Sequence, residues 1–474
     1  MLSLFVILPL AGILILNMPF GKATRNLGFP CVFLLAALQI VAVAWWPSGS
    51  PIGTPSLDHF LGLGLKADGL AFVLLLTIGI VLLAAMLVGH AMISGERQRS
   101  NFANVLLLSL AGMNGTVLLT DLFSFYVFLE VTSVSSFILI AFERRKESLE
   151  GAFKYLVLSA VATVLMLSAV GILLLVAGGT SYETVAAALR SAGGSPMAKI
   201  AVGAFVCGLF IKGGLVPFHG WLPGAYSSAP ASVSVLLAGI VTKVSGIYGL
   251  LRLTLSVFPP SASLNEVLLL AGAISIAVGA LAAMGQTDMK GLLAYSSISQ
   301  VGYIVLGLGC GTKLGIAAAI LHLFNHSIFK SLLFVNAAAV EQRSGTTDMT
   351  RIGGLGPRMP VTGVTNVIAA LSTAGVPPFS GFWSKLGIVI ALWQTGRYGY
   401  AGLAVLFSVV TLSYLLTMQR QVFFGKTPSH LAETREATLA LVVPAVALAA
   451  ITLAVGLLFP WLFNTFLFPA GGII

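Results

Sequence analysis

The sequence predicts an all-α polytopic membrane protein with about fourteen transmembrane helices, two inverted five-helix repeats and two broken helices. Composition is the first observation: 58% of the residues are hydrophobic, only 8% are charged, and the mean hydropathy is +1.01. A soluble protein carries about 25% charged residues. The other two observations are a series of apolar runs of membrane-spanning length and a pair of similar proline-containing breaks inside two of those runs.

Fourteen apolar runs separated by turn-forming residues approach or exceed the roughly 20 residues that a spanning helix needs. The expected spans cover residues 2–18, 27–46, 67–93, 103–120, 122–142, 152–177, 198–222, 230–256, 265–284, 291–310, 314–339, 361–393, 399–423 and 438–467. No basic region precedes the first run and no small-residue cleavage site follows it, so we expect a helix rather than a signal peptide. The longest connection, residues 342–360, is rich in glycine and proline and is expected to be a loop.

Basic residues are unevenly divided between the connections, which we number by the span that precedes each. Of the 25 lysines and arginines, 15 lie in odd connections, 6 in even ones and 4 inside spans. Cytoplasmic connections are enriched in lysine and arginine. We therefore expect odd connections in the cytoplasm and both termini outside. The membrane is expected to be the cytoplasmic (inner) membrane of a prokaryote. The net charge of +10 then reflects membrane orientation, and no nucleic-acid partner is expected.

Two spans are interrupted by similar segments, Val216–Trp221 and Pro377–Phe382, which carry Pro217 and the pair Pro377 and Pro378. Proline removes a helical hydrogen-bond donor, and such breaks persist in a membrane where protein or water satisfies the freed backbone groups. Repeated breaks an odd number of spans apart are typical of inverted-repeat transporters. The expected units are 1–102 (helices 1–3), 103–258 (first repeat, helices 4–8), 259–425 (second repeat, helices 9–13) and 426–474 (helix 14).

Seven ionisable residues lie inside the expected spans. A charge at the bilayer centre costs at least about 2.5–3.5 kcal/mol, so such residues are rare and commonly face a transport pathway. Each of the seven can take up and release a proton, which indicates a chain of proton-transfer sites through the membrane. The seven residues are Glu130, Lys212, Lys243, His322, His326, Lys330 and Lys385.

Glu130 is the only carboxylate well inside an expected span, so a neighbouring lysine could switch it between its neutral and ionised forms. Lys212 precedes the break at Pro217, and Lys243 stands in the middle of its span. Burial disfavours the ammonium form of a lysine, which makes both residues candidates for proton release. The structural alternatives are a helix–helix hydrogen bond for Glu130 and a lysine that reaches the membrane interface for Lys212.

His322, His326 and Lys330 are spaced four residues apart and therefore lie within about 80° of one helix face over about 12 Å. Histidine exchanges protons near neutral pH, so this ladder is suited to proton transfer. Two other interpretations stay open: a zinc site, although no glutamate and no third ligand accompany the pair, and a pair of structural core histidines with satisfied hydrogen bonds. Lys385 follows the second break, with an interfacial anchor as its alternative, and His219 at the first break is a candidate accessory residue.

No cofactor and no metal site are expected in this chain. Cys31, Cys207 and Cys310 are far apart and lie in apolar runs, so they are expected to be packing residues. The sequence contains no nucleotide-binding loop, haem-ligand pair or redox cysteine set. Electron transfer within this chain is therefore not expected.

Three segments carry a family resemblance: Leu209–Pro230, His322–Phe334 and Gly375–Lys385. They resemble signatures of the antiporter-like subunits of respiratory complex I, a family that includes Mrp cation/proton antiporters and the membrane arms of energy-converting hydrogenases. The likeness extends over about residues 67–425. It implies fourteen helices, an inverted repeat and a central hydrated axis. The short segment after the fourteenth span resembles the shorter members, which lack a long lateral helix.

The resemblance also implies roles. The matching positions are Glu130 in span five, Lys212 in span seven, Lys243 in span eight (histidine in other members), the relay His322, His326 and Lys330 in span eleven, and the terminal Lys385 in span twelve. The implied function is proton translocation within a larger membrane complex, of the redox-driven complex I or group 4 hydrogenase/formate hydrogenlyase type. This chain would then be a non-redox subunit of an oxidoreductase complex, with other membrane subunits, the lipid bilayer and protons as its partners.

Three alternatives stay open at this stage. An Mrp-type subunit would exchange sodium ions for protons, although a single interior carboxylate favours protons. A stand-alone secondary transporter of a small solute would share the broken helices and repeats. A passive scaffold for a soluble enzyme would need none of the buried charges.

Overall fold

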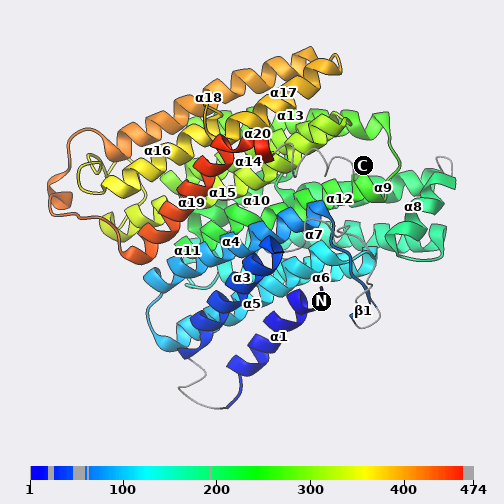
Figure 1. Cartoon of the computed structure of the whole chain (residues 1–474), viewed down its shortest axis with the longest axis horizontal. Coiled ribbons are helices and arrows are strands. Elements are labelled where there is room, and N and C mark those ends of the chain that lie inside the picture. Colours follow the sequence, from blue (N-terminus) through cyan, green and yellow to red (C-terminus); the bar gives the residue numbers. More distant parts are fainter. Residues whose placement is uncertain (1, 20–25, 46–58, 61–62, 192–194, 463–474) are drawn as a thin grey trace.

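The structure, a computed structural model, describes residues 2–19, 26–45, 59–60, 63–191 and 195–462. Long helices lie side by side across the molecule (Figure 1). The first half comprises α1 (Leu4–Leu16), α3 (Gly28–Ala44), β1 (His59–Phe60), β2 (Leu63–Gly64), α4 (Gly69–Met92), α5 (Glu96–Leu118), α6 (Leu122–Ile140), α7 (Lys146–Ala177), α8 (Tyr182–Ser191), α9 (Pro196–Gly213), η1 (Phe218–Gly220), α10 (Trp221–Ser228), α11 (Ala231–Leu236), η2 (Leu237–Val241), η3 (Lys243–Tyr248) and α12 (Gly249–Ser256).

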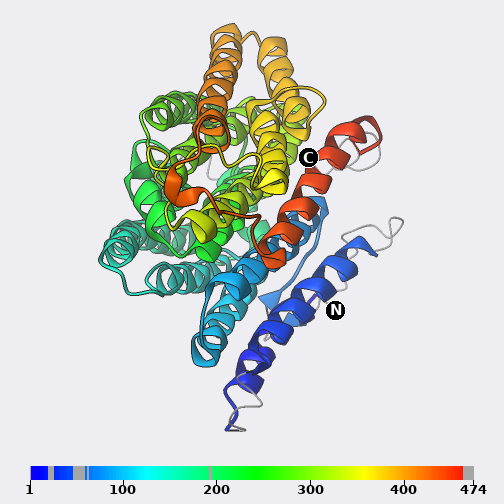
Figure 2. The same cartoon turned by 90° about the vertical axis from the view of Figure 1, so that its left-hand side faces the viewer.

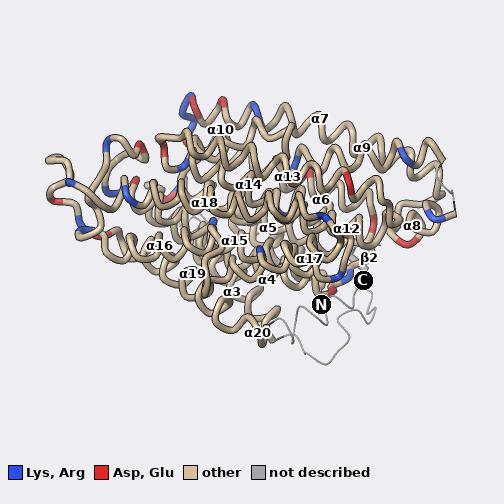
Figure 3. Tube along the Cα trace, turned by 90° about the horizontal axis from the view of Figure 1, so that it is seen from above, with Lys and Arg blue, Asp and Glu red and all other residues tan. Residues whose placement is uncertain are grey.

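The second half continues the same pattern of long helices and short connections. It comprises α13 (Ala262–Met284), α14 (Met289–Gly309), α15 (Lys313–Ser344), α16 (Pro360–Ala374), α17 (Ser380–Gln394), α18 (Tyr398–Phe423), η4 (Ser429–Leu431), α19 (Leu439–Leu457) and α20 (Phe459–Leu462). In Figure 2, α1, α3 and α19 lie along one side of the main bundle. Charged residues gather toward the helix ends, and a few lie between the helices (Figure 3).

The predicted all-helical membrane fold is confirmed. In the described residues, 11 helices are long and apolar enough to cross a membrane. The other three expected spans coincide with shorter helices: α1, α3 and the two 15-residue helices α16 and α17 on either side of the second break. The total of fourteen stays a prediction. The short helix α8 was not predicted, although Tyr182, Val185 and Leu189 give it one buried face.

Contacts between connections follow the odd and even numbering of the expected spans. Even connections and the helix ends beside them contact only other even ones in these examples, and odd connections contact other odd ones. Spans that alternate in direction require this, because they place all even connections on one side of the molecule and all odd connections on the other. The even contacts join Lys66 to Leu118, Asp68 to Arg252 and Glu266 to Arg397; the odd contacts join Met289 to Thr347, Gly354 to Phe424 and Thr362 to Glu436. We call these two sides of the molecule the even face and the odd face.

One local arrangement occurs on both faces. Asp121 caps α6 by accepting a hydrogen bond from the Ser124 amide at 2.8 Å, and it accepts another from the Thr180 hydroxyl, 59 residues further on. Asp288 caps α14 in the same way and accepts from Thr347, again 59 residues further on. Both aspartates also form an isolated antiparallel bridge with the residue after the threonine. The first arrangement lies at the even face and the second at the odd face.

Small residues allow the closest helix contacts. A side chain at Gly302 of α14 would lie 2.6 Å from the Gly272 carbonyl oxygen of α13. A side chain at Gly246 would lie 2.3 Å from the backbone of Gly213, at the end of α9. Glycine at such points lets membrane helices approach backbone to backbone. The second contact sets the position of α9 against η3, and α9 carries Lys212.

Candidate functional site

Glu130 of α6 and Lys212 of α9 form an ion pair inside the bundle. The Lys212 Nζ lies 2.8 Å from Glu130 Oε1 and also donates to the hydroxyls of Ser133 at 2.8 Å and Ser159 at 2.6 Å. Three acceptors match the three donors of an ammonium group. The Lys212 side chain is fully buried, whereas that of Glu130 is 23% exposed and accepts a further bond from Thr163 at 2.8 Å. The pocket therefore offers an acceptor to each of the three donors of a lysine ammonium group.

The break after α9 places Lys212 at a helix end. Helix α9 ends at Gly213, and Gly214 adopts a left-handed conformation with φ of 67°. Lys212 is thus in the last turn, where the helix dipole favours a cation. The indole nitrogen of Trp221 donates to the Ile211 carbonyl at 2.9 Å, which satisfies one of the backbone groups freed by the break.

The second break is built in the same manner. Helix α16 ends at Ala374, and Gly375 is left-handed with φ of 82°. The next amide, that of Val376, bonds back to Leu371 at 3.0 Å, just as Leu215 bonds back to Phe210 at the first break. Both predicted broken helices are therefore present.

Lys243 begins the π-helical segment η3 and follows another, η2, after one residue. Its side chain is fully buried, and its Nζ donates to the Ala238 carbonyl. A π-helical turn in a membrane span frequently marks a functional site. The sequence did not predict the π-helical geometry, because the apolar pattern of this span is compatible with an ordinary α-helix.

His322 and His326 stack with nearly parallel rings, at a centroid separation of 6.2 Å and an angle of 9°. His322 Nδ1 lies 2.9 Å from the Ser384 hydroxyl, whereas its Nε2 and both His326 nitrogens lack a partner among the described residues. Lys330 donates to the Leu293 carbonyl of α14 at 3.1 Å. All three side chains of the ladder are fully buried on α15. Unpaired buried nitrogens of this kind are sites where water binds.

Lys385 of α17 extends the ladder. It is 4% exposed, and its Nζ lies 4.3 Å above the centre of the Tyr303 ring, whose centroid is 5.7 Å from that of His322. Asn325 also contacts Ser384, the partner of His322, and donates to the Ser380 carbonyl at 2.9 Å.

The seven predicted residues form two clusters. The first cluster is Glu130 and Lys212 with their serines and Thr163. The second cluster is Lys243, His322, His326, Lys330 and Lys385, in which Lys243 lies within electrostatic range of both histidines and of Lys330. In the part of the chain that the structure describes, no hydrogen bond or ion pair joins the two clusters directly. The half-buried His219 makes no hydrogen bond to either cluster.

Sequence analysis missed the hydroxyl residues Ser133, Ser159, Thr163 and Ser384. Ser133 lies one helical turn from Glu130 and could have been found from helical spacing. The others belong to different helices, so only the fold brings them to the site. Within the described ranges, no group of three or more metal-binding side chains lies together, and the three cysteines are free and half-buried.

Comparisons with known proteins agree on the class of the chain. Residues 120–411 match the family described as NADH:quinone oxidoreductase/Mrp antiporter, transmembrane. A Na(+)/H(+) antiporter subunit of Alkalihalophilus pseudofirmus is 33% identical, over 90% of this chain and 87% of its own length. An NADH-quinone oxidoreductase subunit of Desulforudis audaxviator is 35% identical, over 77% of this chain and 74% of its own.

The fold has solved counterparts as well. A chain in the structure of the Mrp complex from Dietzia sp. DQ12-45-1b superposes with a TM-score of 0.89 and 26% identity, covering 100% of this chain and 96% of that one. Family match, relatives and fold agree with the resemblance carried by the three motifs. The chain therefore belongs to the NADH:quinone oxidoreductase/Mrp antiporter family of antiporter-like membrane subunits.

Proposed function

We propose that this chain is a proton-translocating, antiporter-like subunit of a multisubunit membrane complex. The observation that carries the proposal is the buried Lys212 ammonium, which is held by the Glu130 carboxylate and two hydroxyls inside a membrane helix bundle. A permanently structural contact at this depth would need no charge. A charged pair whose two members come from different helices can open and close as those helices move.

Opening the ion pair changes how strongly Lys212 binds its proton. At the observed 2.8 Å and an effective dielectric constant near 20, the gross attraction is about 6 kcal/mol. Separation of Glu130 removes that attraction and leaves a fully buried ammonium with only two serine partners, which favours release of the proton to a neighbouring acceptor. Closing the pair reverses the effect, so movement of one carboxylate drives a cycle of proton release and uptake.

The proton is then passed through Lys243, His322, His326 and Lys330 to Lys385. The unpaired nitrogens of the two histidines support this route, since each can donate to or accept from water in the interior. His219 stays an accessory candidate without a contact to the route. Water is required between the two clusters, because no side chain bridges them among the described residues.

The units and orientation are part of the proposal. Residues 103–258 and 259–425 form two inverted repeats, between residues 1–102 and 426–474. The recurrence of the Asp121–Thr180 arrangement as Asp288–Thr347 on the opposite face supports the inversion. The odd face is cytoplasmic, both termini lie outside, and the membrane is the inner membrane of a prokaryote.

Two kinds of complex are compatible with the family, and the chain carries no redox centre of its own in either. A redox-driven complex of the complex I or group 4 hydrogenase type agrees with the likeness to an NADH-quinone oxidoreductase subunit. An Mrp-type sodium/proton antiporter agrees with the likeness to a Na(+)/H(+) antiporter subunit over 90% of the chain. A single carboxylate in the first cluster favours protons over sodium as the ion that passes along this route.

The function is tested by ion translocation in native membrane vesicles. Glu130→Gln and Lys212→Ala are expected to abolish most proton translocation while the complex still assembles. Translocation at the wild-type rate in either variant would refute the route. Mass spectrometry of the gently solubilised complex separates the two kinds: iron–sulfur or nickel–iron subunits identify a redox-driven complex, and membrane subunits alone identify an Mrp-type complex. Solute uptake by the isolated chain would instead support a stand-alone transporter.

A further inference from the structure

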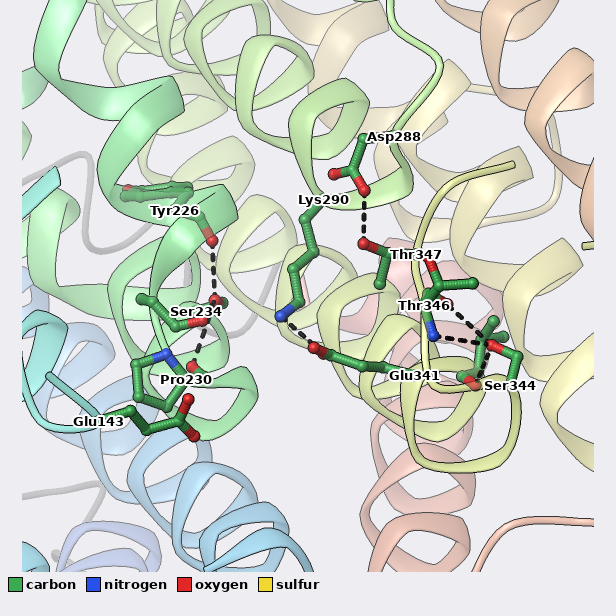
Figure 4. Close-up of polar contacts among 12 residues, drawn as sticks. Glu143, Tyr226, Pro230, Ser234, Asp288, Lys290, Glu341, Ser344, Thr346 and Thr347 are labelled. Carbon is green, nitrogen blue, oxygen red and sulfur yellow. Dashed lines mark hydrogen bonds and ion pairs between the residues drawn. The ribbon is translucent and has the colours of Figure 1, made fainter. Parts of the chain in front are cut away.

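Lys290 and Glu341 form a second interior ion pair, at the odd face and outside both clusters. Their Nζ and Oε2 atoms lie 2.6 Å apart, and Figure 4 shows Lys290 reaching from the start of α14 toward Glu341 on α15. Lys290 is 4% exposed, whereas the Glu341 side chain is 24% exposed. Neither side chain makes a hydrogen bond to another described residue. The pair thus joins a buried ammonium to a carboxylate that water can reach.

Both charges occupy unfavourable helix ends. Lys290 is the second residue of α14, and Glu341 lies in the last turn of α15. The N-terminus of a helix carries partial positive charge and the C-terminus partial negative charge, so each end opposes the charge placed on it. The two ions are therefore held by one another, and neutralising one releases the other.

Helix α14 connects the pair to the second cluster. Lys330 donates to the carbonyl of Leu293, which is one helical turn after Lys290, about 5 Å along the axis of α14. Among the described residues, this is the contact by which the buried ladder approaches the odd face. Lys330 lies 11 residues before Glu341 on α15, about 16 Å along the helix axis, so a proton that leaves Lys290 needs a chain of water molecules to reach Lys330.

Other ionisable groups around the pair have partners of their own. Glu143, Tyr226 and Asp288 are the other ionisable residues labelled in Figure 4. Glu143 pairs with Arg145 at 3.0 Å, the Tyr226 hydroxyl bonds to Leu237 and Thr242, and Asp288 caps α14 and binds Thr347. In the part of the chain that the structure describes, none of the three forms an ion pair with Lys290 or Glu341.

The Asp288–Thr347 contact beside this pair does not require the pair. The equivalent arrangement in the first half, Asp121 with Thr180, forms without one. Lys290 lies two residues after Asp288, and the residue two after Asp121 is Phe123. Glu341 lies six residues before Thr347, and the residue six before Thr180 is Leu174. Both Phe123 and Leu174 are apolar and exposed. The same Asp–Thr contact therefore holds its helices together without a buried charge.

We propose that Lys290 and Glu341 form a gate at the odd face through which Lys330 is reloaded with a proton from the aqueous phase after it has passed its own proton to Lys385. Glu341 binds a proton from the aqueous phase, and the neutral carboxyl group no longer holds Lys290. Lys290 then transfers its proton, through water, to the neutral amine of Lys330. The Glu341 proton moves to Lys290 and restores the pair, so that one proton has passed from water to Lys330. This proposal rests on the proposed function, because a gate has a role only if protons move through the second cluster.

The decisive variant exchanges the two charges, Lys290→Glu with Glu341→Lys. The exchanged ions lie at favourable helix ends and keep their mutual attraction, so the complex is expected to assemble in normal amount. Because the exchanged pair is locked in its ionised form, we expect proton translocation in vesicles of known orientation to fall at least about tenfold, which corresponds to about 1.4 kcal/mol of activation free energy. A wild-type rate would show that the pair is only a structural clamp and would overturn the proposal.

A single variant provides a second readout. In Glu341→Gln, position 341 can no longer bind a proton and pass it to Lys290, so proton translocation is expected to fall at least about tenfold, as in the exchanged pair. Glu143→Gln, a carboxylate of the same face, is the matched control and should behave as wild type. Translocation at the wild-type rate in Glu341→Gln would also contradict the gate.

The same vesicles separate the two proposals through Glu130→Gln. If Glu130→Gln abolishes translocation while the exchanged pair translocates at the wild-type rate, only the gate is wrong. If Glu130→Gln translocates like wild type, the proposed function itself is wrong, whatever the exchanged pair does.

Discussion

Glu130→Gln should separate the stability of the bundle from its transport function. Glutamine keeps the shape of the side chain and an oxygen that accepts from Thr163 and Lys212, but it removes the negative charge 2.8 Å from a fully buried ammonium. Removing one member of a buried ion pair costs about 3–5 kcal/mol, because the other charge is left uncompensated. Since Ser133 and Ser159 still accept from Lys212, we expect the lower end, about 3 kcal/mol.

A double variant tests the origin of that cost. In Glu130→Gln with Lys212→Met, no uncompensated charge remains, and replacing a buried ion pair by uncharged groups of similar size is commonly neutral or stabilising. The double variant should therefore regain the thermal stability of the wild type in detergent, while proton translocation stays absent in vesicles. Glu150→Gln is the matched control, because its carboxylate pairs with Lys154 on an exposed helix face and should change neither quantity.

The reasoning is refuted by either of two results. If the single variant is as stable as the wild type, the pair carries no net charge–charge stabilisation. If the double variant regains translocation along with stability, the charges of the first cluster are not part of the route. Thermal denaturation of the purified complex and proton uptake by vesicles measure the two quantities on the same preparations.

Further outcomes follow from three other positions. Ser384→Ala removes the hydrogen-bond partner of His322 Nδ1, a loss of about 1 kcal/mol, so proton translocation should slow several-fold without loss of assembly. Gly246→Ala places a methyl group 2.3 Å from the end of α9 and should destabilise the bundle by about 1–3 kcal/mol, measured by thermal denaturation. Burial raises the pKa of the Asp68 carboxyl, but the ion pair with Arg252 and the hydrogen bond from the Ala71 amide outweigh burial and hold that pKa below its usual range. The stability that Asp68 contributes is therefore present above about pH 4 and is lost as the pH falls through the lowered pKa, whereas Asp68→Asn should lack this acid-dependent loss.

Matched controls accompany two of these variants. Gly402→Ala adds a methyl group where no other atom lies within 4 Å and should leave stability unchanged. Asp121→Asn also replaces a helix-capping aspartate, but no cation pairs with Asp121 among the described residues, so it should cost less than Asp68→Asn. Equal losses for Asp68→Asn and Asp121→Asn would show that Arg252 adds nothing to the effect of the cap.

Sequence alone predicted the membrane fold, the two breaks and the residues that carry charge into the bundle. Each of these depends on the free-energy cost of placing a polar group in lipid. That cost determines the residue pattern within a single segment, so it can be recognised in the sequence. Glu130 and Lys243 stand out against apolar neighbours for that reason, and Pro217 and Pro378 interrupt apolar runs where a straight helix would otherwise be expected.

Tertiary structure decided which of those residues meet. The Glu130–Lys212 pair and its serines come from three helices, and the division into two clusters depends on how the helices pack rather than on any local pattern. The π-helical geometry at Lys243 and the Lys290–Glu341 pair were likewise invisible in the sequence. The free energy of transferring a polar side chain into lipid is a property of one residue in one segment. The formation of an ion pair depends on distances between segments, and only the packed bundle fixes those distances.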